Sequence, residues 1–134
     1  MIVVLDASAA AEIAGQSHSG IEIINMIMNA GKVMAPDLYI AEITNYIWKH
    51  SRKAKAQSGE FAKIVEDCID YIHEYTDAAD LWKDAFFLAQ EYDHPVYDML
   101  YAALARRHDA VLLTMDKGLR RVCEKASIKT IGIN

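Results

Sequence analysis

The sequence predicts an α/β fold of three layers, in which helices cover both faces of a central, mostly parallel sheet, within one domain spanning residues 1–134. Apolar runs at residues 2–5 and 111–114 are rich in valine, isoleucine and leucine, as strands buried on both faces usually are. Helical patterns alternate with such runs along the chain, which is typical of parallel sheets. A chain of 134 residues buries enough surface to fold without disulfides or a structural metal.

In the first half of the chain, glycine and proline mark the ends of the expected elements. The elements are a strand at 2–5, a helix from Asp6 to Gly15, a helix at 21–29, a strand at 32–35 and a helix from Pro36 to about residue 55. Gly15 and Gly31 fit the ends of the first two helices, because glycine favours positions just after a helix. Pro36 suits the first helical turn, and Asp37 is expected to be the N-cap of the long helix.

The second half begins with a turn at Ser58 and Gly59 and is broken again at Pro95. The expected elements are helices at 60–75, 79–92 and 96–108, a strand at 111–114, a helix at 117–125 and a strand at 129–133. The helices at 60–75 and 79–92 follow each other closely and could pair as a hairpin.

The charge balance excludes one class of protein. A net charge of −5, from 19 acidic and 14 basic residues, is unlike the basic balance of a general nucleic-acid coat protein. The charge is unevenly spread: residues 47–58 have four basic residues and no acid, whereas residues 59–93 have ten acids and two lysines. A nuclease that binds divalent cations stays possible, because two such cations would cancel four carboxylates.

Cysteine content and hydrophobicity exclude further classes. Cys68 and Cys123 are too few and too far apart for a disulfide scaffold or a zinc knuckle, and are expected to be small buried side chains. Polar residues interrupt every apolar run before it reaches the length of a membrane span. Residues 1–5 lead directly into Asp6 and are expected to form a strand rather than a signal peptide, so we expect a cytoplasmic protein with no membrane partner.

Four acids stand where the fold class places ligand sites. Asp6 and Asp116 follow the two apolar runs, and Glu42 and Asp98 fall in the early turns of helices. Ligands of open α/β sheets bind outside the carboxyl ends of the strands, so a parallel sheet could bring all four to one edge. Each aspartate has a simpler alternative, because it could cap a helix or interact with its dipole. Glu42 is harder to explain in this way, since it lies further into an apolar helix.

Carboxylates crowded in this way repel one another and resist ionisation. Mg²⁺ or Mn²⁺ would relieve the repulsion, because these cations prefer oxygen ligands. No grouping of histidine and cysteine with zinc-ligand spacing is present in the sequence. A site with two cations can activate water and stabilise the leaving oxygen in phosphodiester hydrolysis.

The chain also resembles a known family. Four motifs carry the resemblance, VVLDASA at 3–9, PDL with EITN at 36–45, VYD with YAALA at 96–105, and LTMD with L at 113–119. In this order they resemble the PIN-domain nucleases, most closely the small toxins of VapBC toxin–antitoxin pairs, over essentially the whole chain. The resemblance implies an α/β/α fold and an endoribonuclease that requires Mg²⁺ or Mn²⁺ and leaves 5′-phosphate and 3′-hydroxyl ends.

The resemblance assigns roles to individual residues and implies partners. The residues expected to hold the metal and carry catalysis are Asp6, Glu42, Asp98 and Asp116, with Ser8, Asn45 and Thr114 in supporting roles. The sequence departs from the family pattern where Lys117 and Gly118 replace a further acid, and where His94 precedes Pro95. The implied partners are an RNA substrate, a cognate antitoxin and a second copy of the chain.

A basic stripe runs outward from one of the acids. Glu42, Asn45, Lys49 and Arg52 are spaced by three, four and three residues, so they share one face of the predicted helix. Lys49 and Arg52 are therefore expected to bind the phosphates of RNA. Cations at a helix C-terminus also stabilise the helix dipole, so this alternative stays open.

Two other functions compete with the nuclease. An idle domain of the same fold could bind RNA or a protein without cutting, although none of the four acids is missing. A phosphotransfer domain of the haloacid-dehalogenase type needs a second aspartate two residues after the first, and Ser8 occupies that position.

Overall fold

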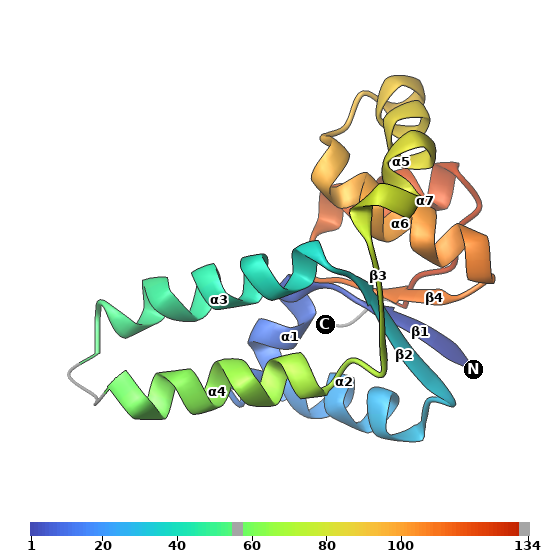
Figure 1. Cartoon of the computed structure of the whole chain (residues 1–134). Helices are drawn as coiled ribbons and strands as arrows, with labels where there is room; N and C mark the ends of the chain where they lie inside the picture. The colour runs from blue at the N-terminus through green and yellow to red at the C-terminus, as the bar shows by residue number, and fades with distance from the viewer. Residues whose placement is uncertain (55–57, 132–134) are drawn as a thin grey trace.

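Four parallel strands form the central sheet of the computed structural model, which describes residues 1–54 and 58–131 (Figure 1). The strands are β1 Ile2–Leu5, β2 Lys32–Pro36, β3 Glu74–Thr76 and β4 Val111–Leu113, in the order β3-β2-β1-β4. Val3 of β1 lies between Val33 of β2 and Val111 of β4. Because all four strands are parallel, their carboxyl ends meet at one edge of the sheet.

Seven helices of the described residues surround this sheet. They are α1 Ala7–Ala14, α2 His18–Asn29, α3 Leu38–Ser51, α4 Ser58–Asp70, α5 Ala78–Tyr92, α6 Val96–His108 and α7 Lys117–Lys125. In Figure 1, α1 and α2 lie below the sheet and α5, α6 and α7 lie above it, whereas α3 and α4 extend side by side to the left. The three-layer α/β/α prediction is confirmed. No described helix combines the length and the apolar character needed to cross a membrane.

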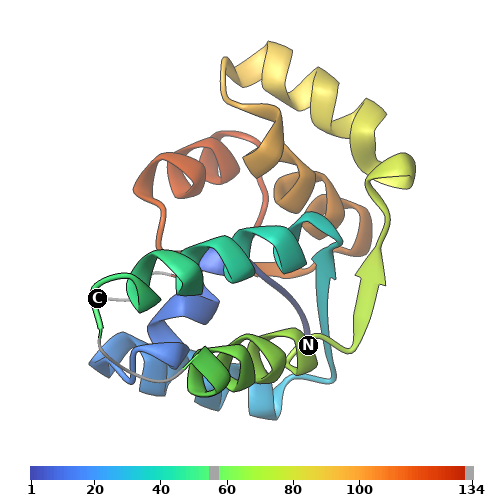
Figure 2. The same cartoon turned by 60° about the vertical axis from the view of Figure 1, so that its left-hand side comes forward.

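Helix α6 is the central helix of the upper layer (Figure 2). All seven residues from Met99 to Ala105 are buried, because α6 packs on β1, β2 and β4 with one side and against α5 with the other. A helix that is apolar on all sides is expected to be buried between other elements of the fold. Its burial fixes the first turn of α6, which carries Asp98, at the carboxyl edge of the sheet.

The predicted helix at 60–75 is too long. Helix α4 ends at Asp70, and Glu74–Thr76 forms the edge strand β3, parallel to β2. A strand of three residues offers too little alternation to be distinguished from the end of an amphipathic helix. The predicted hairpin of the neighbouring helices is also wrong, because β3 separates them and α4 packs on α3 while α5 packs on α6.

Other boundaries differ by a few residues. Pro36 ends β2 instead of beginning α3, and the predicted end of that helix at residue 55 lies outside the described residues. Asp37 directly precedes α3 but does not cap it, since its Oδ1 accepts a hydrogen bond of 3.1 Å from the backbone N–H of Ala78 at the start of α5. Of the predicted strand at 129–133, Thr130 makes an isolated parallel bridge to Leu112, and residues 132 and 133 are outside the described part.

Helices α1 and α2 cross so closely that only glycine fits at residue 20. A Cβ atom at Gly20 would lie 2.1 Å from the carbonyl oxygen of Glu12, which is backbone and cannot swing away. We expect Gly20→Ala to lower the free energy of unfolding by about 1–3 kcal/mol or more, as overpacking does. Urea unfolding measures this change. Gly59→Ala is the matched control, because nothing lies within 4 Å of a Cβ there, and equal midpoints for the two variants would contradict the close crossing.

Candidate functional site

A pocket opens at the carboxyl edge of the sheet and contains all four predicted acids. Its volume is about 240 Å³, and it is lined by Asp6, Ala7, Ser8, Glu42, Tyr46, Asp98, Tyr101 and Asp116. The acids come from four segments: the ends of β1 and β4, the second turn of α3 and the first turn of α6. We call this the carboxylate pocket.

Asp6 is the buried member of the carboxylate pocket, with 6% of its surface exposed. Its Oδ1 accepts hydrogen bonds from Ser8 Oγ (2.7 Å) and from the backbone N–H of Ala9 (2.9 Å), so it also caps α1. Burial raises the pKa of Asp6 to about 6, the hydrogen bonds oppose this rise, and the nearby Asp98 adds to it. Asp6 therefore caps α1 and also lines the carboxylate pocket.

Asp116 likewise has two roles. It is exposed, and its Oδ1 accepts hydrogen bonds from the backbone N–H groups of Gly118 (2.8 Å) and Leu119 (3.1 Å) at the start of α7. A single oxygen accepts both bonds, while the side chain still lines the carboxylate pocket. Capping thus holds the carboxylate in place at the pocket edge.

A buried tyrosine holds Glu42. The hydroxyl of Tyr101 donates a hydrogen bond of 2.7 Å to Glu42 Oε1 from α6 across to α3. Burial raises the pKa of Tyr101 well above its usual value, and the negative Glu42 adds to this, so the hydroxyl stays a proton donor. Burial also raises the pKa of Glu42, although the bond from Tyr101 lowers it.

Asp98 has a partner in His94, at 2.7 Å between Nε2 and Oδ2. His94 departs from the family pattern, and the sequence alone suggested a surface or helix-end role for it. The signal for this contact was the spacing of four residues, which brings side chains together at a helix start. Tyr101 lies three residues after Asp98 in α6, but its hydroxyl contacts Glu42 of α3.

Two hydroxyl groups join the ends of β1 and β4. Ser8 Oγ and Thr114 Oγ1 lie 3.3 Å apart, Ser8 Oγ accepts the backbone N–H of Met115 (3.0 Å), and Thr114 Oγ1 accepts that of Asp116 (3.0 Å). Both hydroxyls thus fix the chain next to the aspartates. Asn45, the third predicted supporting residue, is exposed one turn beyond Glu42 and does not line the carboxylate pocket.

The predicted RNA-binding residues lie further out on α3. Lys49, Arg52 and Lys53 line a separate cavity of about 340 Å³. The guanidinium of Arg52 lies 5.1 Å from the centre of the Trp48 ring, which orients it by a cation–π interaction. The stripe on α3 that begins at Glu42 therefore leads away from the carboxylate pocket, as expected. Its cations, Lys49 and Arg52, do not line that pocket.

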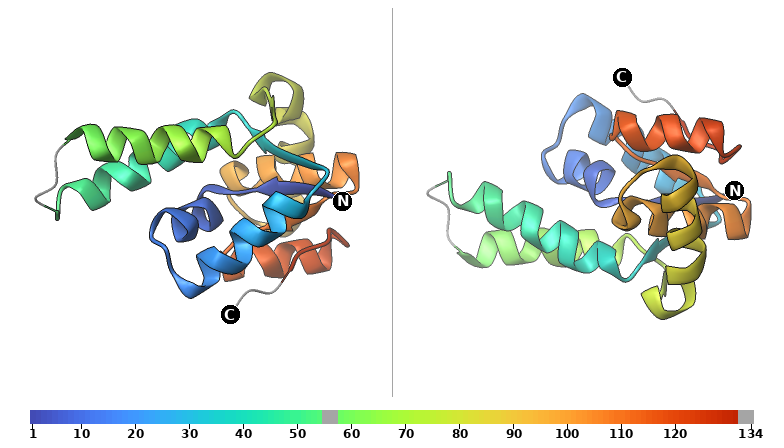
Figure 3. Two further views of the ribbon diagram at one scale, coloured as in Figure 1. Left: turned by 90° about the horizontal axis from the view of Figure 1, so that it is seen from below. Right: turned by 90° about the horizontal axis from the view of Figure 1, so that it is seen from above.

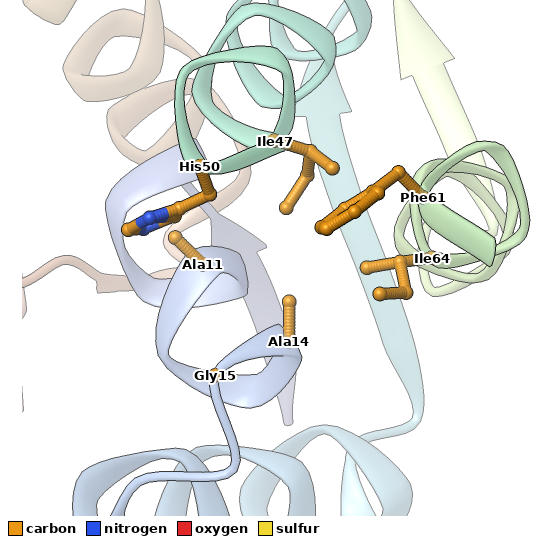
Figure 4. Close-up of a pocket in the computed structure, with 7 residues that line it drawn as sticks. All are labelled: Ala11, Ala14, Gly15, Ile47, His50, Phe61 and Ile64. Atoms are coloured by element: carbon orange, nitrogen blue, oxygen red, sulfur yellow. The ribbon is translucent and has the colours of Figure 1, made fainter. Parts of the chain in front are cut away.

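An apolar pocket of about 210 Å³ lies between α1, α3 and α4 (Figure 4). Its lining residues are Ala11, Ala14, Gly15, Ile47, His50, Phe61 and Ile64. Without a carboxylate it lacks the groups that phosphodiester chemistry needs, although it suits an apolar side chain.

The donor set of the carboxylate pocket fits a hard divalent cation, because carboxylate oxygens are the ligands such cations prefer. Within residues 1–54 and 58–131, no three His, Cys, Asp or Glu side chains already stand close enough together to hold an ion. Each carboxylate is instead held by a partner of its own. Burial raises the pKa values of Asp6 and Glu42, and a bound cation would oppose that rise.

Solved structures share this fold. The chain superimposes on the PAE2754 protein from Pyrobaculum aerophilum with a TM-score of 0.73, at 22% identity, over 91% of this chain and 84% of that one. It also superimposes on a chain of VapBC2 from Rickettsia felis, solved bound to a DNA fragment from their promoter, with a TM-score of 0.70 at 13% identity over 100% of both.

Sequence comparison is more specific. The chain is 32% identical over 124 residues to Ribonuclease VapC3 of Pyrobaculum aerophilum, which is 89% of this chain and 92% of that relative. The PIN domain, as a sequence family, matches residues 3–125 and so includes all four acids of the carboxylate pocket. The chain therefore belongs to the PIN-domain family.

Proposed function

We propose that this protein is an endoribonuclease that uses Mg²⁺ or Mn²⁺ and serves as the toxin of a toxin–antitoxin pair. The observation that carries the proposal is the carboxylate pocket, in which four acids from distant segments line one small space with no basic residue among its lining. The similarity to a protein named as a ribonuclease supports the same reaction.

In this proposal Asp6, Glu42, Asp98 and Asp116 would hold the cation, which would supply the activation of a water and the stabilisation of the leaving oxygen that phosphodiester hydrolysis needs. Tyr101 keeps Glu42 turned into the pocket, and Ser8 and Thr114 hold the backbone beside the aspartates. Asn45 lies between the pocket and the basic end of α3, where it can meet the substrate. Lys49 and Arg52 bind phosphates of the RNA strand at a distance from the cleaved bond.

The test is cleavage of defined, end-labelled single-stranded RNAs. We expect cuts with Mn²⁺ or Mg²⁺, loss of cutting with a chelator, recovery when metal is added back, and 5′-phosphate ends on the products. Cleavage that ignores the chelator would contradict the metal requirement. Binding of RNA without cleavage at any metal concentration would instead identify the idle module.

The same proposal includes two protein partners, an antitoxin and a second copy of the chain. Structural neighbours include toxin–antitoxin assemblies, such as a complex from Klebsiella pneumoniae (TM-score 0.67, 12% identity, 85% of this chain and 86% of that one). Two apolar helical segments, at 21–28 and 61–72, could be covered by an antitoxin. Ile21 and Met28 are exposed, and Phe61 lines the apolar pocket. Light scattering of the chain alone, and with the product of an adjacent reading frame, tests both partners.

A further inference from the structure

A second basic cavity, of about 230 Å³, lies on α7, and neither the sequence pattern nor the carboxylate pocket accounts for it. It is lined by Lys117, Arg120, Arg121, Glu124 and Thr130. Lys117 is three residues before Arg120 and four before Arg121, so all three cations lie on one side of α7. With a single carboxylate among them, the cavity has a net positive charge of two.

Lys117, Arg120 and Arg121 lack the acidic partners that four other cations of the described residues have. Lys32, Lys63, Arg107 and Lys129 each form an ion pair with an acid. Among the described residues, no ion pair or side-chain hydrogen bond joins Lys117, Arg120 or Arg121 to an acid. Three like charges at neighbouring positions repel one another, and a bound anion would relieve that repulsion.

The α7 cavity adjoins the carboxylate pocket. Asp116 lines that pocket and directly precedes Lys117, and the backbone N–H of Arg120 donates to the carbonyl of Asp116 (3.0 Å). The basic end of α3 lies elsewhere: Figure 3 shows α3 reaching to the left and α7 lying to the right of the molecule in both views. The basic cavity on α3 and the basic cavity on α7 therefore lie in different directions from the carboxylate pocket.

We propose that the α7 cavity binds a backbone phosphate of the RNA substrate, on the other side of the cleaved bond from Lys49 and Arg52. This inference rests on the proposed ribonuclease function. A guanidinium presents parallel N–H groups that match the oxygens of a phosphate, and Arg120 and Arg121 supply two of them. The Thr130 hydroxyl can donate a further hydrogen bond. A strand held at both cavities would cross the four carboxylates.

The experiment measures RNA binding in the non-cutting Asp98→Asn protein. Fluorescence anisotropy with a labelled single-stranded RNA gives the affinity at several KCl concentrations, before and after adding Arg120→Gln and Arg121→Gln. Each phosphate contact on a single strand contributes about 0.7 to the slope of log affinity against log salt. We expect the double substitution to make that slope shallower by about 0.7, the contribution of one phosphate.

The matched control replaces two other exposed cations, Lys83 on α5 and Arg106 at the far end of α6, by glutamine. It removes the same charge, and we expect its slope to stay that of the parent. Equal slopes for both pairs would overturn the α7 site, because charge alone would then explain any change. A larger effect on duplex DNA than on RNA would also overturn RNA as the ligand. Circular dichroism checks folding. If the double variant unfolds, the exposed Arg121→Gln alone should still make the slope shallower, by part of the roughly 0.7 expected for one phosphate, and an unchanged slope would overturn the α7 site.

These outcomes are separable from the ribonuclease proposal. If the wild-type chain never cuts RNA but the arginine pair still changes the slope, the phosphate site stands and the nuclease fails. If cutting is metal-dependent and the arginine pair changes neither slope nor cleavage rate, the nuclease stands and the α7 site fails.

Discussion

Asp98→Asn is expected to lower metal-dependent RNA cleavage by at least about a hundredfold, because a cation contributes several kcal/mol to transition-state stabilisation and each 1.36 kcal/mol is tenfold in rate. The substitution keeps the shape of the side chain and removes its charge. The fold should tolerate it, since the buried residues from Met99 to Ala105 that anchor α6 are unchanged. Single-turnover cleavage at saturating Mn²⁺ measures the effect.

The matched control is Asp93→Asn, a change of the same kind five residues earlier in the chain. Asp93 is exposed at the end of α5 with a φ of 51°, a conformation that asparagine adopts readily, and it lies outside the carboxylate pocket. We expect this variant to cut at the wild-type rate. Wild-type cleavage by Asp98→Asn would remove this carboxylate from the proposed mechanism.

The layered fold could be predicted because its strongest signals are local. The run Ile2–Leu5 is too apolar for an exposed strand, and helical patterns separate it from Val111–Leu113, so a parallel sheet follows. Strand β3 could not be predicted, since its pairing with β2 is set by residues about 40 positions earlier. His73 illustrates this dependence: its Nδ1 accepts the backbone N–H of Val33 at 3.0 Å, a contact that no local pattern contains.

The acids of the site could be predicted because the carboxyl edge of a parallel sheet is a known place for ligands. The hydrogen-bond partners of these acids were harder to predict from the sequence. The bond from Tyr101 to Glu42 joins residues 59 positions apart, a separation that no local spacing in the sequence predicts. The α7 cavity could not be predicted, because Thr130 comes next to the α7 residues that line it only in the folded chain.

Asp6→Asn is expected to stabilise the metal-free protein at pH 8 by up to about 3 kcal/mol while removing cleavage. The pKa of Asp6 rises from 3.8 to about 6, chiefly because burial disfavours its charged form, and each pKa unit corresponds to 1.36 kcal/mol. Asparagine carries no charge to bury. Both hydrogen bonds of Asp6, from Ser8 and from Ala9, are accepted by Oδ1, which asparagine retains.

The pH dependence has a definite sign. Below about pH 4, Asp6 is protonated in the folded and unfolded chains, so its charge costs nothing. Between about pH 4 and 6 this carboxyl ionises in the unfolded chain but stays protonated in the folded chain, so the wild-type protein loses stability until the buried group has ionised as well. The advantage of Asp6→Asn should therefore be small at pH 4, grow between pH 4 and 6, and stay constant above that range.

Urea unfolding in chelator at several pH values measures this difference, with Asp93→Asn expected to follow the wild-type profile throughout. Added Mn²⁺ should stabilise the wild-type protein more than the variant, because a ligand that binds only the folded state adds to stability and the variant lacks one of the proposed ligands. A variant that is no more stable than wild type at pH 8 would show that the buried charge of Asp6 is already compensated without metal. The expected result instead makes Asp6 a residue that the fold retains at a cost in stability, and the cation is the partner that offsets that cost.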